Sequence, residues 1–442
     1  MFKATIAALL AIASAATAAP VPGDESGLVS DDQPETSTGT EIARGALWVP
    51  KKLFQLLALP FRGIVFVYDR YQLHDWYYRI FYTRDHLISV VPVLQYRTGL
   101  GLTAGLRFES RDTFGEREYL TAAYSYGGTH RMRSDVSLNS GMRFDPVILR
   151  IGGNFDRYDP LPFYGIGNFG DLSPVPAMPV EPTALAVHTD YRYEESRAAI
   201  DADWRLFDDL HVALHGAWAR IKTSPTPNHR SIEEVYDANV TGFDDTRNHL
   251  YGEGEVRLDR RHRARPLFET SEYSTGGMVR GFGGYLHQLD AGSDFWHYGF
   301  DVQEFVHLSL APKMFVFRLW GEGVTGSIDE VPFYELPYLG GDFLRGYDFA
   351  RFRDRLSAVG SVEYVWDLSR FADASLFAEA GRVWDSWDAI TLDDLRADFG
   401  VGLTLHSLTS FVLAGYVAAS IDGGVNATAT FTSHWDETPR WR

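Results

Sequence analysis

The sequence contains no cysteine and, after its first twenty residues, no apolar stretch near the length of a membrane-spanning helix. Such a helix needs about 20 apolar residues in succession, so a helical membrane protein is excluded. Without cysteine, disulfides cannot stabilise the fold, and its stability must come from packing and backbone hydrogen bonds. Positive charge is scarce too, because 41 lysines and arginines face 59 acids for a formal net charge of −18. That balance excludes general binding to nucleic-acid phosphates.

The motifs of common enzyme classes are also missing. There is no Gly-x-Ser-x-Gly elbow, no His-Glu-x-x-His pair and no phosphate-binding glycine loop. A lipid hydrolase would need serine, histidine and an acid on one wall, and no such set stands out. We therefore expect a protein without enzymatic activity and without a cofactor.

The N-terminal region has the composition of an exported protein. Residues 1–18 are predicted to be a cleaved signal peptide, with Lys3, an apolar run from residue 6 to 16 and small residues before the cleavage point. Residues 19–40 are polar and are expected to form a disordered leader. Residues 41–84 have apolar and aromatic residues at helical spacing, which predicts an amphipathic segment that either lies on a membrane surface or plugs the domain that follows.

From residue 87 onward the period of the apolar residues changes to two. Leu100, Leu102, Ala104 and Leu106 alternate with Thr103 and Arg107, and the same pattern recurs around residues 198–206 and 250–259. A soluble sandwich would bury the apolar face, whereas a membrane barrel directs that face to lipid and the charged face into its lumen. Aromatics on the apolar faces and strands of about ten residues favour the barrel.

The alternation predicts an all-β fold, a single antiparallel transmembrane barrel over residues 85–436 with a tail at 437–442. Sixteen strands are expected, an even number as bacterial barrels require. The last strand should pair with the first so that no edge is exposed to lipid. The strands are expected to begin near residues 87, 100, 117, 131, 146, 187, 210, 248, 272, 295, 312, 356, 371, 396, 409 and 425.

The connections alternate in length. Those after even-numbered strands are mostly short, with residues 261–271 as the exception, and several after odd-numbered strands are long. This asymmetry is typical of barrels with short periplasmic turns and long outer loops. The long connections are residues 158–186, 223–247, 326–355 and 385–395.

The sixth outer loop carries the most informative motif, Leu344-Arg345-Gly346-Tyr347. Strand parity directs Glu363 into the lumen and does the same for Glu379 on the next strand, within Phe377-Ala378-Glu379-Ala380-Gly381. If the loop folds inward, the guanidinium of Arg345 is expected to pair with both carboxylates, a role that lysine could not fill.

These residues resemble the BamA/TamA superfamily of outer-membrane assembly and translocation factors, also called the bacterial surface antigen family. The resemblance implies sixteen strands and an inward-folded sixth loop whose arginine pairs with the acid of a Phe-x-acid-x-Gly motif near a second carboxylate. Residues 163–168 (Phe-Tyr-Gly-Ile-Gly-Asn), in the third outer loop, look like a further family signature. The similarity covers about residues 87–435.

Two features depart from the family pattern. Residues 19–84 are too few for even one of the POTRA domains that family members usually carry, and DETPRWR follows Trp435, where family barrels tend to end. The expectation is thus a POTRA-less member in the bacterial outer membrane.

The expected function is insertion or export of protein or lipid-linked substrates through a lateral seam between the first and last strands. Its partners would be the lipid bilayer, a substrate protein and a periplasmic accessory protein. The alternative is a passive channel or structural barrel occluded by its sixth loop. Equally, the contacts of Arg345 are open to two interpretations: an ion-pair lock that only holds the loop, or one that also sets the seam.

Two polar groups suggest metal sites only superficially. His211 and His215 face the lumen on one strand, where hydrogen bonding is the expected role. The acidic loop at 237–248 lacks the spacing of the twelve-residue calcium loop, so a solvated loop is expected.

Overall fold

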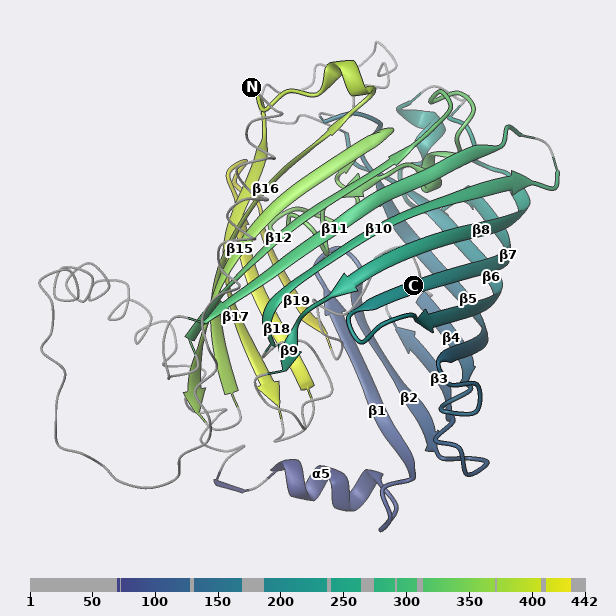
Figure 1. Cartoon of the computed structure of the whole chain (residues 1–442). Helices are drawn as coiled ribbons and strands as arrows, with labels where there is room; N and C mark the ends of the chain where they lie inside the picture. Colours follow the sequence, from purple (N-terminus) through teal and green to yellow (C-terminus); the bar gives the residue numbers. More distant parts are fainter. Residues whose placement is uncertain are drawn as a thin grey trace, which may run out of the picture. The chain divides into compact units, whose positions relative to one another are not determined.

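The computed structural model shows a closed barrel of sixteen antiparallel strands (Figure 1). The residues that the structure describes are 70–71, 73–127, 131–168, 187–236, 240–263, 274–290, 292–307, 313–369, 372–406 and 411–430. No helix among them has the length and apolar character needed to cross a membrane.

Each barrel strand is hydrogen-bonded to the strands before and after it, and β1 also pairs with β19. The two-residue strand β9 (His262–Arg263) adds to the edge of β10. The strands of the barrel are β1 (Ile88–Arg97), β2 (Gly101–Arg111), β3 (Tyr119–Gly127), β4 (Arg131–Asn139), β5 (Val147–Phe163), β6 (Thr189–Arg205), β7 (Leu210–Pro225), β8 (Thr246–Asp259), β10 (Ser274–Gln288), β11 (Phe295–His307), β12 (Lys313–Val324), β15 (Leu356–Ser369), β16 (Ala372–Trp384), β17 (Arg396–His406), β18 (Phe411–Ser420) and β19 (Val425–Thr430).

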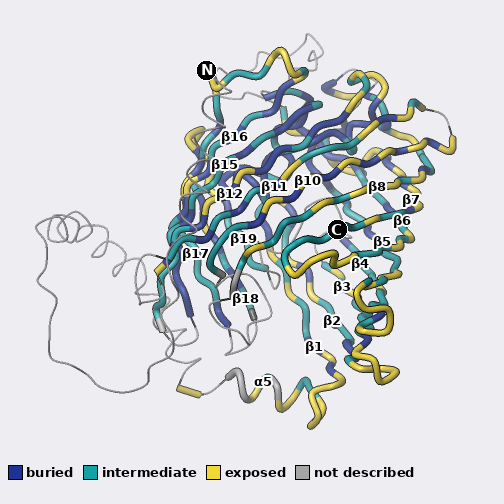
Figure 2. The backbone as a smooth tube through the Cα atoms, in the orientation of Figure 1, coloured by how far each residue is buried: buried dark blue, intermediate teal, exposed yellow. Residues whose placement is uncertain are grey.

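Burial follows the predicted alternation along these strands (Figure 2). On β2, Leu102 is 55 % and Leu106 58 % exposed, while Thr103 and Glu109 between and beyond them are buried. An exposed leucine beside a buried glutamate is the reverse of a water-soluble protein. The outer surface is therefore apolar and the lumen is polar, as a barrel in lipid requires.

The predicted strand starts agree with the observed ones within two residues, but some local expectations were wrong. Strand β4 ends at Asn139 and β5 begins at Val147, so the connection between them, expected to be short, spans residues 140–146. Leu100 was expected on the lipid face, yet it precedes β2 and is buried in an apolar cluster. A turn residue is free of the strand's alternation, so tertiary packing decides its direction.

The long connections gather at one end of the barrel, the loop end. There, apolar side chains from the described parts of the third loop (residues 164–168 and 187–188), the fourth (226–236 and 240–245) and the sixth (325–355) pack with strand ends into one buried cluster, the loop-end cluster. Phe163 packs edge-on against Tyr236 and Phe333, with ring centroids 5.2 and 5.0 Å apart. The cluster consists of Leu100, Leu161, Phe163, Ile166, Tyr191, Ile232, Val235, Tyr236, Val240, Leu286, Phe295, Val324, Val331, Phe333 and Leu336.

One helix, α5 (Leu73–Phe81), lies within the segment predicted to be helical before the barrel. The rings of Tyr77 and Phe81, one turn apart, are 5.0 Å from each other. The predicted signal peptide, the leader and residues 41–69 lie outside the described residues, as does the C-terminal tail. Their boundaries stay predictions.

Candidate functional site

The sixth loop turns back on itself through a short hairpin. Its two arms are β13 (Tyr338–Leu339) and β14 (Phe352–Arg353), which pair antiparallel. Gly340 and Gly341 follow β13 with φ of +112° and +95°, a region that side chains other than glycine rarely enter. Between the two arms of the hairpin, residues 342–349 form a compact tip.

Apolar packing holds this tip against the lumenal side of the wall. Leu344 is fully buried, and Phe343 stacks on the fully buried Trp320 of β12 with ring centroids 5.3 Å apart. Leu344 also has a φ of +56°, a conformation that costs a bulky residue free energy unless its surroundings enforce it.

Arg345 meets both predicted carboxylates. Its Nε donates to Glu379 Oε1 at 3.1 Å, its Nη2 to Glu363 Oε2 at 3.1 Å, and its backbone N–H to Glu379 Oε2 at 2.8 Å. All three side chains are at most 4 % exposed. The guanidinium lies 3.4 Å from the ring centroid of Phe377 and 4.9 Å from that of Tyr416. Two carboxylates and two aromatic faces thus replace the water that the cation has lost.

Gly346 is required because its backbone lies against the wall. Its N–H donates to Asp398 Oδ2 at 2.5 Å, and a Cβ at this position would lie 2.7 Å from Asp398 Cβ and 2.9 Å from Ser420 N. Gly381 of the Phe-x-acid-x-Gly motif is similarly enclosed, since a Cβ there would lie 2.7 Å from the carbonyl oxygen of Ala358. Both glycines let backbone and loop approach closely.

The structure adds an acid that the sequence reasoning missed. Asp398 on β17 lies directly opposite Glu379 in the strand register and accepts the bond from Gly346. Strand parity gave a usable signal, because the neighbour of an inward residue in register also points inward. The loop tip therefore contacts three carboxylates, on β15, β16 and β17.

The same tip reaches both sides of the junction between β1 and β19. Asp342 forms an ion pair with Arg97, the last residue of β1, and the Arg97 guanidinium lies 5.5 Å from the Phe349 ring centroid. On the other side, the Tyr347 hydroxyl donates to Asp422 Oδ2 at 2.9 Å, in the turn between β18 and β19. The sixth loop thus bridges the junction.

In the described part of the chain, few residue pairs are in register between β1 and β19. Tyr96 pairs with Ala429 and Arg97 with Thr428, and Thr98 N donates to the carbonyl of Ala427 at 3.0 Å. Between β18 and β19, six residues of β19 are in register, and between β1 and β2 all ten residues of β1 are.

The third-loop signature contacts the back of the sixth loop. The Tyr164 hydroxyl donates to Asp348 Oδ2 at 2.6 Å, and Gly167 N donates to the Arg353 carbonyl at 2.6 Å. Asn168 Nδ2 donates to the Asp394 carbonyl at 3.0 Å, which links this signature to the seventh connection (residues 385–395) as well.

The two groups considered for metal binding have other partners. His211 Nδ1 lies 2.8 Å from Asp203 Oδ1, and His215 hydrogen-bonds to Asp201. In the acidic loop, Asp245 pairs with Arg247 at 2.8 Å, while residues 237–239 lie outside the described part. Within the described ranges, no group of three or more His, Asp or Glu side chains is arranged to hold a metal ion.

Comparison with known proteins agrees with this architecture. Residues 263–411 match the sequence profile of the Omp85 superfamily domain. This range includes the Leu344–Tyr347 motif and both lumenal glutamates, and it confirms the resemblance to the BamA/TamA superfamily. No curated protein sequence matches the chain.

Among solved structures, the fold is similar to that of BamA from Haemophilus ducreyi lacking POTRA domains 1-3. The TM-score is 0.54 at 14 % identity, over 78 % of this chain and 70 % of that one. CdiB from Acinetobacter baumannii gives a TM-score of 0.48 and CdiB from Escherichia coli one of 0.46, each at 10 % identity over 77 % of this chain. The chain spans 58 % and 62 % of the length of those two proteins.

Proposed function

We propose that this barrel, which carries an Omp85 superfamily domain, inserts or exports protein or lipid-linked substrates in the bacterial outer membrane through the seam between β1 and β19. The observation that carries the proposal is the sixth loop, which is anchored on β1 by Asp342 and beside β19 by Tyr347. A loop fixed on both sides of one strand junction is placed to control whether that junction opens.

The loop end gives a second argument for a lateral route. The loop-end cluster places buried apolar side chains from three loops at this end of the barrel. A wide passive channel needs a wet path along its axis, and this cluster opposes one. A substrate that enters the lumen would therefore leave sideways, through the seam.

The seam supplies binding energy without bond-breaking chemistry or a cofactor. If the junction opens, the unpaired N–H and C=O groups of β1 accept a substrate strand by β-augmentation. Backbone hydrogen bonds are the same for every sequence, so one edge would serve many substrates. An accessory protein, or the segment before the barrel, would recruit the substrate from the periplasm.

Locking the seam tests this proposal directly, because the native chain has no cysteine to interfere. Tyr96→Cys and Ala429→Cys stand opposite each other across the junction. We expect that a disulfide or a short thiol linker between them abolishes function, since the strands can no longer separate. The measurement is the protein content of the outer membrane and medium, by mass spectrometry, in cells whose only copy carries the pair. Reduction should restore it.

The matched control is Leu106→Cys with Tyr124→Cys, an opposed lipid-facing pair on β2 and β3. Linking this pair should leave function intact, because the barrel wall there does not open. A seam-locked protein that performs as well as the control contradicts the lateral route. Large steady conductance of the unmodified barrel in planar bilayers would instead support the channel.

The ion pair of Arg97 with Asp342 should control how often the seam between β1 and β19 opens. Asp342→Asn removes one anchor, and we expect the seam to open more often because the β1 side is released. The expected change is about 1 kcal/mol, since the Asp342 side chain is 29 % exposed. The measurement is the rate of cross-linking between Tyr96→Cys and Ala429→Cys, which should fall. Exchanging the charges, with Arg97→Asp and Asp342→Arg, should restore the rate; an unchanged rate in Asp342→Asn would show that the pair does not restrain the seam.

A further inference from the structure

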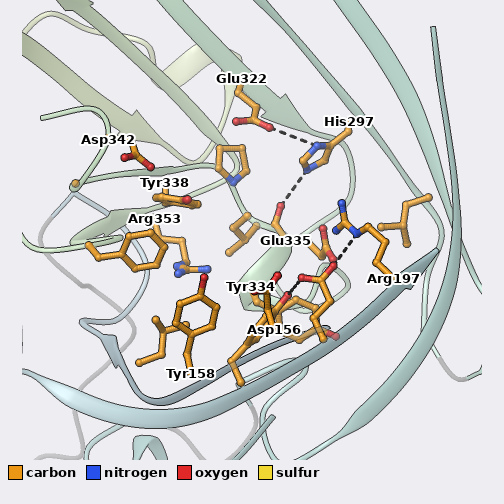
Figure 3. Close-up of a pocket in the computed structure, with 18 of the residues that line it drawn as sticks. Asp156, Tyr158, Arg197, His297, Glu322, Tyr334, Glu335, Tyr338, Asp342 and Arg353 are labelled. Carbon is orange, nitrogen blue, oxygen red and sulfur yellow. Dashed lines mark hydrogen bonds and ion pairs between the residues drawn. The ribbon is translucent and has the colours of Figure 1, made fainter. Parts of the chain in front are cut away.

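The seventh connection (residues 385–395) presents large apolar side chains at the loop end of the barrel. Trp387 is 65 % and Leu392 is 68 % exposed. The lumenal side of the loop end is different, because a cavity of about 210 Å³ under the sixth loop contains polar groups that contact each other (Figure 3). His297 Nδ1, for example, lies 3.4 Å from Glu322 Oε1. The exposed side chains of the seventh connection therefore need a separate explanation.

Trp387 lies against the lipid-facing side of the barrel wall. Its ring stacks on Tyr298 of β11, with ring centroids 6.0 Å apart and planes 13° from parallel, and its Nε1 donates to the Tyr298 hydroxyl at 3.0 Å. On β11, Trp296 and Phe300 are 54 % and 39 % exposed, whereas Asp301 is fully buried. Tyr298 lies at the alternate position between the two exposed rings, so the strand alternation directs it to lipid.

Protein covers the wall beside this stack. A Cβ at Gly323 of β12 would lie 2.8 Å from Tyr298 Cε2 and 2.6 Å from Leu356 Cδ2, so Tyr298 and Leu356 meet on the same face. Leu356 is only 5 % exposed there, whereas Phe317, farther from the loop end on β12, is 45 % exposed. The lipid-facing wall is thus covered at its outer end, where the Trp387 ring lies.

Charged side chains fix the seventh connection over this part of the wall. Arg382, at a lipid-facing position of β16, donates through Nη1 to the carbonyl oxygen of Asp393 and lies 3.9 Å from Asp394 Oδ2. At the start of the connection, Arg355 Nη1 lies 3.5 Å from Asp385 Oδ1. The connection is therefore held near both ends, and the contacts of Trp387 and Arg382 place it on the outer face of the wall.

We propose that the seventh connection is a lipid-binding surface, in which Trp387 and Leu392 insert among the headgroups of the outer leaflet. The Trp387–Tyr298 stack makes this surface continuous with the lipid-facing wall. Tryptophan and tyrosine rings are enriched at the level of the headgroups, where one part of the ring is apolar and the other polar. Asp388 and Asp393 are exposed in the same connection, and carboxylates are costly in hydrocarbon, so the connection lies at the headgroups and no deeper.

A second copy of the barrel is the competing occupant of these side chains. The whole connection is shorter than the roughly 20–30 residues that each partner contributes to a stable protein interface. The indole N–H of Trp387 is already bonded within its own chain, so it offers no donor to a partner protein. Lipid needs no complementary protein surface and is present on all sides of the wall.

Single spin labels test the proposal, because the native chain has no cysteine. A nitroxide is attached to Leu392→Cys in the full-length barrel, with one barrel in each phosphatidylcholine nanodisc. Electron paramagnetic resonance then compares its collisions with oxygen, which concentrates in lipid, and with a nickel chelate, which stays in water. We expect an oxygen-to-nickel ratio well above that of a label at Asp329→Cys in the sixth loop, and below that of a label at the lipid-facing Leu214→Cys.

Trp387→Ser tests the anchor itself. Without the ring that stacks on Tyr298, the label at Leu392→Cys should move into water and its ratio should fall to that of Asp329→Cys. Phe207→Ser is the matched control, because Phe207 is 71 % exposed in the turn between β6 and β7, at the other end of the barrel. It should leave the ratio unchanged. Heat-modifiability on gels checks that each variant is a folded barrel.

Three outcomes overturn the proposal. The first is a label at Leu392→Cys with the ratio of Asp329→Cys, which needs no Trp387 variant. The second is an unchanged ratio in Trp387→Ser. The third is a label that the nickel chelate reaches in single-barrel nanodiscs but not when two barrels share a nanodisc, which would identify a second copy as the occupant.

Discussion

Replacing Arg345 by alanine should release the sixth loop and lower function far more than it lowers expression. The substitution leaves Glu363 and Glu379 buried without the cation that both contact, at 3.1 Å each. Removing one partner of such a buried pair typically costs about 3–5 kcal/mol. The equilibrium constant for docking of the loop then falls by roughly two to three and a half orders of magnitude, about tenfold for each 1.4 kcal/mol. Limited proteolysis, with cleavage sites mapped between residues 340 and 355, measures the release.

Two further variants separate charge from geometry at Arg345. Arg345→Lys keeps the charge but lacks the planar fork that contacts both carboxylates, so it should recover only part of the protection. Arg345→Ala combined with Glu379→Gln removes one uncompensated charge and should be less destabilised than Arg345→Ala alone. A protease-resistant loop and full function in Arg345→Ala would exclude the role proposed for this residue.

Gly346→Ala should also release the loop and lower function, by a smaller free energy, while leaving every charged group in place. The new Cβ would lie 2.7 Å from Asp398 Cβ, 2.9 Å from Ser420 N and 3.0 Å from Ala419 C. Two of these are backbone atoms at the end of β18, so the loop tip has to move and the 2.5 Å bond from Gly346 N to Asp398 is lost. Overpacking of this kind costs about 1–3 kcal/mol. The same proteolysis and outer-membrane protein measurements apply.

Gly360→Ala on β15 is the matched control, since a Cβ there would have no neighbour within 4 Å. It should behave like the unsubstituted protein. If Gly346→Ala is equally silent, the close approach of the loop to β17 and β18 does not matter for function. If Gly346→Ala is inactive but its loop stays protected, the tip has a role beyond docking.

The motif residues show which parts of the site a sequence pattern can predict. Parity along β15 and β16 sufficed to direct Glu363 and Glu379 inward, because alternation is a property of each strand alone. The loop motif then indicated which cation they meet. Asp398 was missed because its role depends on register with the neighbouring strand and on where the loop tip comes to rest.

The contacts at the β1–β19 seam could not be predicted from the sequence, for the same reason. Arg97 and Asp342 are 245 residues apart, and no periodicity links them. The loop-end cluster also combines side chains from loops and distant strands. Leu100 illustrates the limit locally, since a residue one position before its strand is buried by packing from other loops.

By itself, the sequence determined that this chain forms a sixteen-stranded barrel, nearly where each strand begins, and which loop bears the arginine. It did so because a strand between lipid and a wet lumen must alternate apolar and polar side chains. This alternation can be recognised from consecutive residues of the sequence. Only the tertiary structure decided that the sixth loop spans the β1–β19 junction and that Asp398 joins its carboxylate partners. These features arise when barrel closure brings distant segments together, and closure fixes distances that no local pattern encodes.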